Sequence, residues 1–535
     1  MERRGSERLD LDFLSLPPYS AEVRVRSDSL SSTGSCGKFV LRQRVAQLMT
    51  CMEDVSSDDD IHEELSRSID QAFLICGKKM PSRLQDFRLQ VVTWNVGTAS
   101  PPRDLSSLLL LDSPVSNIDM YVIGLQEVNS KIVNFLSDLA FDDPWSLFLM
   151  DILAPLGYIK LSSIRMQGLL LLIFLKHRHI PFVQDIHTNY IRTGLYGYWG
   201  NKGGVTVRMS VYGHMLCFMN CHLPAHMENT NQRLDDFERM LEAQQFDGES
   251  IGGILDHDAV FWFGDLNFRI ADFGIHFIRE VVNGNRYNLL WEKDQLNIAK
   301  KKEQFLQGFM EGPLKFKPTY KFDLNSDVYD TSGKKRKPAW TDRILWKLKE
   351  VSESEPDEFA GSEFEHILKI HLEKYTSHMS YGISDHKPVT GTFILQMRPL
   401  ILEPPVTLRA EGEWNADHDS LVSYSVSKDF PSSTWDWIGL YRVGFRHTND
   451  YVTYAWVKDD EISFSKDCSQ VYISADEIPL DGGEFVLSYF CHNLQCLAGI
   501  SEPFQIQPGR TLPEKNGSLE SDDSSKSDMF TGAGF

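Results

Sequence analysis

Blocks of apolar residues that end in polar residues recur along the middle of the chain, and these blocks predict strands. Five of them are rich in β-branched and aromatic residues, namely LQVVTWNV (89–96), MYVIGLQEV (120–128), GLLLLIFLK (168–176), GVTVRMSVYGHMLCFMNCHL (204–223) and AVFWFGDLNF (259–268). Continuous apolar runs of this kind are typical of strands that are covered on both faces. VTGTFIL at 389–395 predicts a further strand.

Helical periods lie between these strands. Within residues 230–246, Leu234, Phe237 and Leu241 recur at a spacing of three to four residues, which predicts an amphipathic helix. Shorter helices are expected at 104–111 and 131–139. Because strands alternate with helices, we expect one large α/β domain that spans residues 85–398.

The N-terminal arm has a different composition. Residues 1–84 are rich in Ser and in charged residues, as in RVRSDSLSSTGS and EDVSSDDD. Segments of this kind bury too little apolar surface to offset the entropy cost of folding. We therefore expect most of the arm to be disordered, with two short amphipathic helices at 40–53 and 60–75.

The C-terminal part predicts a second, smaller domain. After a linker with two adjacent prolines, short runs such as LVSYSV, WIGLY and EFVLSYF are separated by turn residues. This pattern predicts an all-β sandwich over residues 406–508, with Trp435, Trp437 and Trp456 in its core. Residues 509–535, rich in Ser, Asp and Gly, are expected to be disordered.

Composition and charge exclude several classes of protein. The chain has 535 residues with 54 Lys and Arg against 75 Asp and Glu, and its net charge of −21 excludes a globally basic nucleic-acid coat. No apolar run reaches the roughly 18 residues of a membrane helix, and the acidic N-terminus is unlike a signal peptide. We therefore expect a cytoplasmic protein that is not secreted, whose eight cysteines are free thiols.

Polar side chains follow the ends of the predicted strands, where open α/β sheets place their functional sites. These residues are Asn95, Glu127, His222, Asp265, Asn267, Asp342, Asp385 and His386. Asn and carboxylate oxygens suit a hard divalent cation such as Mg²⁺. No Cys or Ser nucleophile with an adjacent base stands out, which favours hydrolysis of a phosphate ester by direct attack of water.

Eight motifs carry a resemblance to a known family. They are, in order, WNV, GLQEV, GNKGG, CHLPAH, WFGDLNFRI, PTYKFD, PAWTDRIL and SDHKP. Through them residues 87–397 resemble the inositol polyphosphate 5-phosphatases of the DNase-I-like endonuclease/exonuclease/phosphatase superfamily. The resemblance implies a four-layered α/β sandwich with Mg²⁺ as cofactor. PSSTWDWIGLYRVG and DYVTYAWV are similar to the SKICH domain, which implies an immunoglobulin-like sandwich that binds protein partners.

The resemblance also implies roles for the residues that would bind metal and water. Glu127 matches the principal Mg²⁺ ligand, and Asn95 and Asp385 contribute to the metal environment. Asp265 matches the residue that orients or deprotonates the attacking water. Asn267 would hold this water or the phosphate.

Further roles concern the phosphate that is removed. His386, paired with Asp342, matches the dyad that contacts this phosphate, and His222 would donate to a phosphoryl oxygen. For His226, a contact with the site and a supporting role are equally expected. The family usually has Arg-Asn after the CHLxAH motif, whereas this chain has Leu234 in place of the asparagine.

A local basic cluster indicates the nature of the substrate. Residues 315–343 contain eight Lys and Arg but only four Asp, within a chain that is strongly acidic. A solvated loop is the alternative, but a polyanionic substrate explains the cluster better because Lys is a good ligand for phosphate. The resemblance implies ligands for the phosphate next to the one removed, namely Tyr320, Lys321 and Lys334. Arg269 and Lys202 are further candidates.

The family resemblance implies an enzyme that removes the 5-phosphate of phosphoinositides and so damps phosphoinositide and insulin-type signalling. Expected substrates are phosphatidylinositol 4,5-bisphosphate and 3,4,5-trisphosphate, with soluble inositol polyphosphates as further candidates. The enzyme would be recruited peripherally to the cytosolic face of the plasma membrane or endoplasmic reticulum. The alternatives are a nuclease of the same superfamily, against which PTYK and PAWTDRIL argue, and a catalytically weak SKICH adaptor.

Overall fold

Two mixed sheets form the centre of the first domain in this computed structural model. The first sheet has the strand order β11-β12-β1-β2-β4-β3 and the second has the order β5-β6-β7-β8-β10-β9. The strands of the first sheet are β1 (Gln85–Asn95), β2 (Met120–Gln126), β3 (Tyr158–Met166), β4 (Leu169–Lys176), β11 (Leu368–Ser377) and β12 (Val389–Met397). Those of the second are β5 (Val183–Gly194), β6 (Trp199–Val211), β7 (His214–His222), β8 (Ala259–Asp265), β9 (Met310–Glu311) and β10 (Asp342–Leu348).

The structure describes most of both domains but not the ends of the chain. The described residues are 84–112, 117–129, 143–194, 199–244, 246, 252–349, 368–428, 430–458, 461–465 and 468–509. The predictions for the N-terminal arm, for the helix at 131–139 and for the tail beyond residue 509 lie outside these residues. Among the described helices, none is both long and apolar enough to cross a bilayer.

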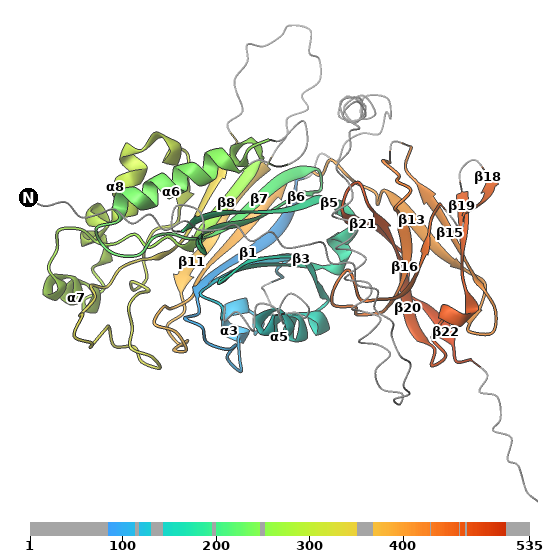
Figure 1. Ribbon diagram of the computed structural model, residues 1–535, viewed down its shortest axis with the longest axis horizontal. Helices are drawn as coiled ribbons and strands as arrows, with labels where there is room; N and C mark the ends of the chain where they lie inside the picture. Colours follow the sequence, from blue (N-terminus) through green and yellow to red (C-terminus); the bar gives the residue numbers. More distant parts are fainter. Residues whose placement is uncertain are drawn as a thin grey trace, which may run out of the picture. The chain divides into compact units, whose positions relative to one another are not determined.

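The two sheets pack face to face and helices cover their outer faces. Side chains such as Val91, Val122, Val207 and Phe261 are fully buried in the core between the sheets. Helices α3 (Ser106–Leu109) and α5 (Pro144–Leu153) cover the first sheet, and α6 (Thr230–Ala243) and α8 (Gln295–Lys302) cover the second (Figure 1). This arrangement confirms the predicted four-layered α/β sandwich.

Burial on both faces explains the continuous apolar runs of the central strands. All seven residues of β2 are buried. Val122 points into the core between the sheets, whereas its neighbour Ile123 packs in the layer of α3 and α5. The outer face of the second sheet is covered in the same way, since Trp262 of β8 stacks on Phe237 of α6 with 3.9 Å between ring centroids.

The predicted helices differ in how well they match the structure. The amphipathic helix expected at 230–246 is confirmed as α6. The helix expected at 104–111 is present only as the single turn α3. The Asp104 carboxylate accepts a hydrogen bond from the amide of Ser106, the first residue of this turn. Helix α7 (Ile275–Asn283) packs its apolar side chains against the core, and no residue range was predicted for it.

The C-terminal part forms the predicted all-β sandwich. One sheet has the order β13-β15-β19-β18, and the other has β14-β22-β20-β16-β17 with β21 paired to β20. The strands are β13 (Val406–Glu411), β14 (Trp414–Asn415), β15 (Ser420–Val426), β16 (Trp437–Arg442), β17 (Tyr451–Trp456), β18 (Glu461–Ser465), β19 (Cys468–Ile473), β20 (Gly483–Cys491), β21 (Cys496–Ile500) and β22 (Phe504–Gln507). Trp414, Ile438, Leu440 and Leu487 are buried between the sheets.

The expectation that three tryptophans lie in this core was wrong. Trp435 is 51% exposed, and Trp437 and Trp456 are only partly buried. Trp437 and Trp456 are paired across β16 and β17, and Trp437 stacks on Phe490 of β20 with ring centroids 5.0 Å apart. Since the alternate residue Ile438 fills the core, these aromatic rings lie on the outer face of the sheet.

A buried ion-pair network fixes the beginning of β10. Arg343 has no exposed surface, and its guanidinium donates to Asp294 Oδ1 at 2.9 Å and to Glu311 Oε1 and Oε2 at 2.6 and 2.7 Å. From the sequence, Arg343 was expected to belong to the basic cluster of residues 315–343. That assignment was wrong, because this guanidinium is committed to two carboxylates inside the fold.

We predict that Arg343→Leu lowers the free energy of unfolding by about 3–5 kcal/mol, because it leaves the Asp294 and Glu311 carboxylates buried without their cation. Urea unfolding followed by tryptophan fluorescence measures the change.

Arg442→Leu is the matched control, since Arg442 pairs with Asp481 at the surface, where both side chains are well exposed. The control should cost less than about 1 kcal/mol. Equal effects of the two substitutions would contradict the structural role assigned to the buried network.

Candidate active site

Strand register brings the predicted polar residues to one edge of the two sheets. In the second sheet, His222 at the end of β7 and Asp342 at the start of β10 are both register partners of Asp265 at the end of β8. In the first sheet, Asn95 ends β1, and Glu127 directly follows β2, which runs parallel to β1. The ends of both sheets therefore supply side chains to one cluster.

The carboxylate of Asp265 lies at the centre of this cluster and is 1% exposed. Its Oδ2 accepts a hydrogen bond from Asn95 Nδ2 at 3.0 Å, and it lies 3.3 Å from His222 Nε2 and 3.9 Å from His386 Nε2. Burial by itself raises the pKa of Asp265, but the charge of His386, the hydrogen bond of His222 and the charge of Lys202 outweigh it and hold this pKa well below its ordinary value. Asp265 is therefore an ionised, buried carboxylate.

His386 is held as a cation by its neighbours. Its Nδ1 lies 3.0 Å from Asp342 Oδ2, which also accepts hydrogen bonds from Thr319 Oγ1 at 2.6 Å and Thr341 Oγ1 at 2.9 Å. Burial lowers the pKa of His386, but the charges of Asp342 and Asp265 outweigh burial and raise it to about 9. An imidazolium at neutral pH, with Nε2 directed toward Asp265, suits the binding of a phosphoryl oxygen.

A second cation enters the cluster from β6. Lys202 Nζ is in hydrogen-bond contact with His222 Nε2. Burial lowers the pKa of Lys202 to about 8, and burial together with Lys202 lowers the pKa of His222. At neutral pH the positive charge at this position is therefore on Lys202, and His222 is neutral.

Glu127 offers the most accessible carboxylate of the cluster. Its side chain is 47% exposed, and its backbone has a φ of +54°. Asn95 Nδ2 donates to Glu127 Oε1 at 3.1 Å and thereby links this carboxylate to that of Asp265. Gly168 packs closely against the backbone of Glu127, because a Cβ added at Gly168 would lie only 3.3 Å from the Glu127 Cα. Two carboxylates held side by side by one amide are a suitable oxygen donor set for Mg²⁺.

A second group in the cluster also has the spacing of a metal site. Asp265, Asp342 and His386 are buried and offer ligand atoms within 4.8 Å of one another. An imidazolium has no free lone pair for a metal, so His386 serves better as a cation beside a metal than as a ligand. Asp385, expected in the metal environment, forms an ion pair with Lys321, and its charge also acts on His386.

A basic hollow of about 300 Å³ adjoins the cluster. The Arg269 guanidinium lies over the Tyr320 ring at 4.3 Å, and this ring lies 4.5 Å from that of His386. Arg269 Nε donates to the Asn267 carbonyl at 3.1 Å, so that Asn267 orients Arg269. The other residues that line the hollow are Ala225, His226, Met227, Lys334, Lys335, Arg336 and Lys337. Of the basic residues predicted here, Lys321 points to Asp385 and does not line the hollow.

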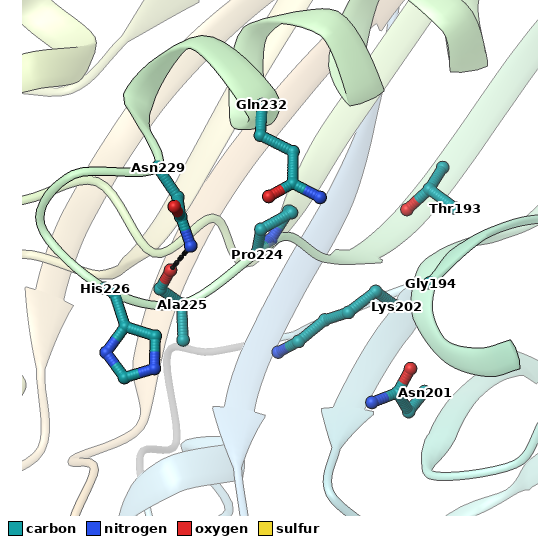
Figure 2. A pocket seen from close by; sticks show the side chains of 9 residues that line it. All are labelled: Thr193, Gly194, Asn201, Lys202, Pro224, Ala225, His226, Asn229 and Gln232. Atoms are coloured by element: carbon teal, nitrogen blue, oxygen red, sulfur yellow. Dashed lines mark hydrogen bonds between the residues drawn. The ribbon is translucent and has the colours of Figure 1, made fainter. Parts of the chain in front are cut away.

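A second hollow of about 420 Å³ shares Ala225 and His226 with the basic hollow (Figure 2). Its lining consists of Thr193, Gly194, Asn201, Lys202, Pro224, Ala225, His226, Asn229 and Gln232. Asn229 Nδ2 donates to the Ala225 carbonyl at 2.7 Å, and Lys202 reaches into the hollow in Figure 2. Ala225 and His226 line both hollows, so His226 lies between them and outside the Asp265 cluster.

Arg233 holds this segment in place, and sequence reasoning assigned it no role. Its side chain is fully buried, and Nη1 donates to the carbonyls of Pro224 at 3.0 Å and His226 at 2.7 Å. Nη2 donates to Gln295 Oε1 at 2.7 Å, and this oxygen also accepts from the Arg269 amide. The sequence did indicate that Arg233 is buried, because it precedes Phe237 by four residues and so lies on the apolar face of the predicted helix.

Comparisons with known families agree with this geometry. Residues 92–392 match the family described as Endonuclease/Exonuclease/phosphatase family 2, and residues 406–506 match the SKICH domain. The first match covers more than half of the chain, and it places the first domain in this class of phosphatases and nucleases.

Individual relatives narrow the class. Inositol polyphosphate 5-phosphatase K of Mus musculus is 53% identical over 431 residues, which cover 80% of this chain and 92% of that protein. Phosphatidylinositol 4,5-bisphosphate 5-phosphatase A of Homo sapiens is 50% identical over 441 residues, which cover 82% of this chain but 43% of that protein. Among solved structures, this chain is similar to the inositol polyphosphate 5-phosphatase domain of SPsynaptojanin, which was solved in complex with inositol (1,4)-bisphosphate and calcium ion. The two chains superpose with a TM-score of 0.51 and are 27% identical in sequence. The superposition covers 64% of this chain and 93% of the synaptojanin chain.

The chain therefore belongs to the inositol polyphosphate 5-phosphatase family and is a phosphoinositide 5-phosphatase with a C-terminal SKICH domain. The family assignment removes the nuclease and the inactive adaptor as alternatives.

We predict that Asp342→Asn shifts the alkaline side of the pH–rate profile. Wild-type activity should fall as the pH rises through about 9, where His386 loses its proton. Without the Asp342 charge, the pKa of His386 is lower, so the fall should come at lower pH. The rate at pH 7.5 should drop about 10²-fold.

Asp481→Asn, which removes an exposed carboxylate of the SKICH domain, is the control and should leave the profile unchanged. An alkaline limb that stays in place in Asp342→Asn would show that this pair does not set the protonation of His386.

Proposed function

We propose that this enzyme hydrolyses the 5-phosphate of phosphatidylinositol 4,5-bisphosphate and 3,4,5-trisphosphate, with Mg²⁺ as its cofactor and water as the nucleophile. Soluble inositol polyphosphates that carry the same adjacent phosphates are further candidate substrates. The observation that carries the proposal is the contact between an ionised Asp265 and a protonated His386, next to a hollow lined by basic side chains. This arrangement places a base and a cation where a phosphate can bind between them.

The side chains divide the chemistry among them. Asp265 orients the attacking water and accepts its proton, and the His386 cation neutralises charge on the phosphoryl oxygens. Lys202 adds a second positive charge through its contact with His222. Glu127 and Asp265 would hold Mg²⁺, with Asn95 between them, and the ion would neutralise phosphate charge when bound. A bond forms from the water oxygen to phosphorus, and the bond from phosphorus to the 5-oxygen of inositol breaks.

The hollow beside His386 accounts for the expected preference for adjacent phosphates. Arg269 and Tyr320 form its inner wall, and Lys334 belongs to its outer basic wall. A 4-phosphate projects from the ring carbon next to the 5-phosphate, so it would enter this hollow when the 5-phosphate meets His386. Guanidinium and ammonium groups are the usual protein ligands of phosphate.

The second domain supports an interaction role. The SKICH sandwich, for which we propose the bounds 406–508 beside a catalytic domain at 85–398, would bind protein partners and not nucleic acid. The enzyme would act in the cytoplasm, recruited peripherally to the plasma membrane or the endoplasmic reticulum, where removal of the 5-phosphate damps phosphoinositide and insulin-type signalling. The exposed ring of Trp435, which lies edge to face with the partly buried Trp456, gives this domain a surface suited to contacts.

Phosphate release from short-chain lipids tests the reaction. We expect Mg²⁺-dependent release from phosphatidylinositol 4,5-bisphosphate and at least tenfold slower release from the lipid with a 5-phosphate alone. Asp265→Asn should abolish release, because it removes the base and a metal-binding carboxylate together. Absence of release from every lipid by folded wild-type protein would contradict the proposal.

Lys334→Ala tests the site of the 4-phosphate. The variant should lose about tenfold in kcat/KM for phosphatidylinositol 4,5-bisphosphate, because a charged phosphate contact is lost. It should keep its activity on the lipid that carries only the 5-phosphate. Lys315→Ala is the matched control, because Lys315 is exposed in the same basic segment but does not line the hollow. Equal losses on both lipids would show that Lys334 does not bind the 4-phosphate.

A further inference from the structure

Two large apolar side chains are exposed at the tip of the loop that carries the basic residues. Leu324 is 64% exposed and Val328 is 55% exposed. The chain turns back between them as a tight hairpin, in which the Asp323 amide donates to the Val328 carbonyl at 2.9 Å. At the base of the hairpin, Phe322 stacks on Tyr329 with ring centroids 4.2 Å apart.

The tip is fastened to the body of the domain. The Asn325 amide donates to the Gly382 carbonyl at 2.7 Å, and a Cβ at Gly382 would lie only 2.9 Å from the Asn325 Cα. The buried side chain of Lys387 donates to the Ser326 carbonyl at 3.2 Å and to Asp327 Oδ1 at 3.1 Å. The outward position of the two apolar side chains is therefore fixed by backbone contacts on the opposite side of the tip.

The same loop borders the active site. The Phe322 amide donates to the carbonyl of Asp385, the residue before His386. The returning arm of the loop leads to Lys334, Lys335, Arg336 and Lys337, which line the basic hollow. Asp330 joins the two arms, because its amide donates to the Lys321 carbonyl at 2.9 Å and its Oδ2 accepts from the Arg336 amide at 2.7 Å. The apolar tip and the basic arm are thus parts of one hydrogen-bonded loop beside the site.

The positive charge of this loop indicates that it would bind an anionic surface. Lys334 and Lys335 are exposed, whereas the acidic Asp327 at the tip is already paired with Lys387. The positive charges of these two exposed lysines would attract an anionic surface. Exposed aliphatic side chains next to lysines are characteristic of proteins that bind the interface of an anionic bilayer.

We propose that residues 322–337 dock the enzyme on an anionic bilayer, with Leu324 and Val328 entering the headgroup region while Lys334 and Lys335 contact anionic headgroups. The inference rests on the proposed function, since it assumes that the substrate is presented in a membrane. It adds the surface that meets the membrane, and it explains why a loop that lines a polar site carries two uncovered aliphatic side chains.

Vesicle binding by the full-length chain tests the proposal. The double variant Leu324→Ser/Val328→Ser should bind vesicles of phosphatidylcholine with 20% phosphatidylserine at least tenfold more weakly than wild type in a sedimentation assay. Its kcat/KM on monomeric short-chain phosphatidylinositol 4,5-bisphosphate should be unchanged. Leu480→Ser is the control, because Leu480 is 72% exposed in the SKICH domain, and it should bind as wild type does.

A second variant guards against a general loss of folding. Leu324→Trp enlarges the apolar tip with a side chain that favours the bilayer interface, and it should bind the same vesicles more tightly than wild type. The proposal would be overturned if the double variant bound the vesicles as tightly as wild type, or if Leu480→Ser weakened binding as much as the double variant does. It would also be overturned if Leu324→Trp bound no more tightly than wild type. Failure of the proposed reaction is distinguishable, because it would abolish turnover of the monomeric lipid while vesicle binding remained.

Discussion

The carboxylate of Asp265 is the group on which the arrangement of this enzyme depends. A buried carboxylate without partners would be strongly destabilising, so it must be surrounded by donors and cations. Asn95 comes to it from the first sheet, and His222 comes from the second. His386, which precedes β12, adds a charge that Asp342 holds in place. The need to compensate one buried charge therefore fastens the edges of two sheets together, and the resulting cluster is the candidate active site.

This constraint separates the rigid part of the site from the part that recognises substrate. The Asp265 cluster is placed by strand register and by buried ion pairs such as that of Arg343, the residue after Asp342. The basic hollow is built instead from the segment 224–227 and from the loop 322–337, both held to the core by hydrogen bonds such as those of Arg233. In this account the sheets fix the residues assigned to the chemistry, whereas the proposed contacts with phosphates and with the bilayer come from loops.

Much of this could be predicted from the sequence, because apolar runs that end in polar residues define both the strands and the candidate site. The α/β class of the first domain, the helix at α6 and the all-β second domain followed from local patterns, whereas the four-layered sandwich was implied by the family resemblance. Burial of individual residues was harder to predict, since it depends on pairing between distant strands. Arg343 appeared to belong to a basic surface but faces two buried carboxylates, and Trp435 was expected in a core but is exposed. The supporting contacts of Arg233 and Thr319 likewise depend on segments far apart in the chain.

Direct attack of water at the Asp265 cluster is the central claim, and a rapid acid quench with substrate labelled with ³²P in the 5-phosphate tests it most directly. If Asp265 activates water, label should pass from lipid to inorganic phosphate at every time point of a single turnover, with none bound to protein. A ³²P-labelled protein that forms and decays at the rate of turnover would instead show a covalent phosphoenzyme, and would contradict the account.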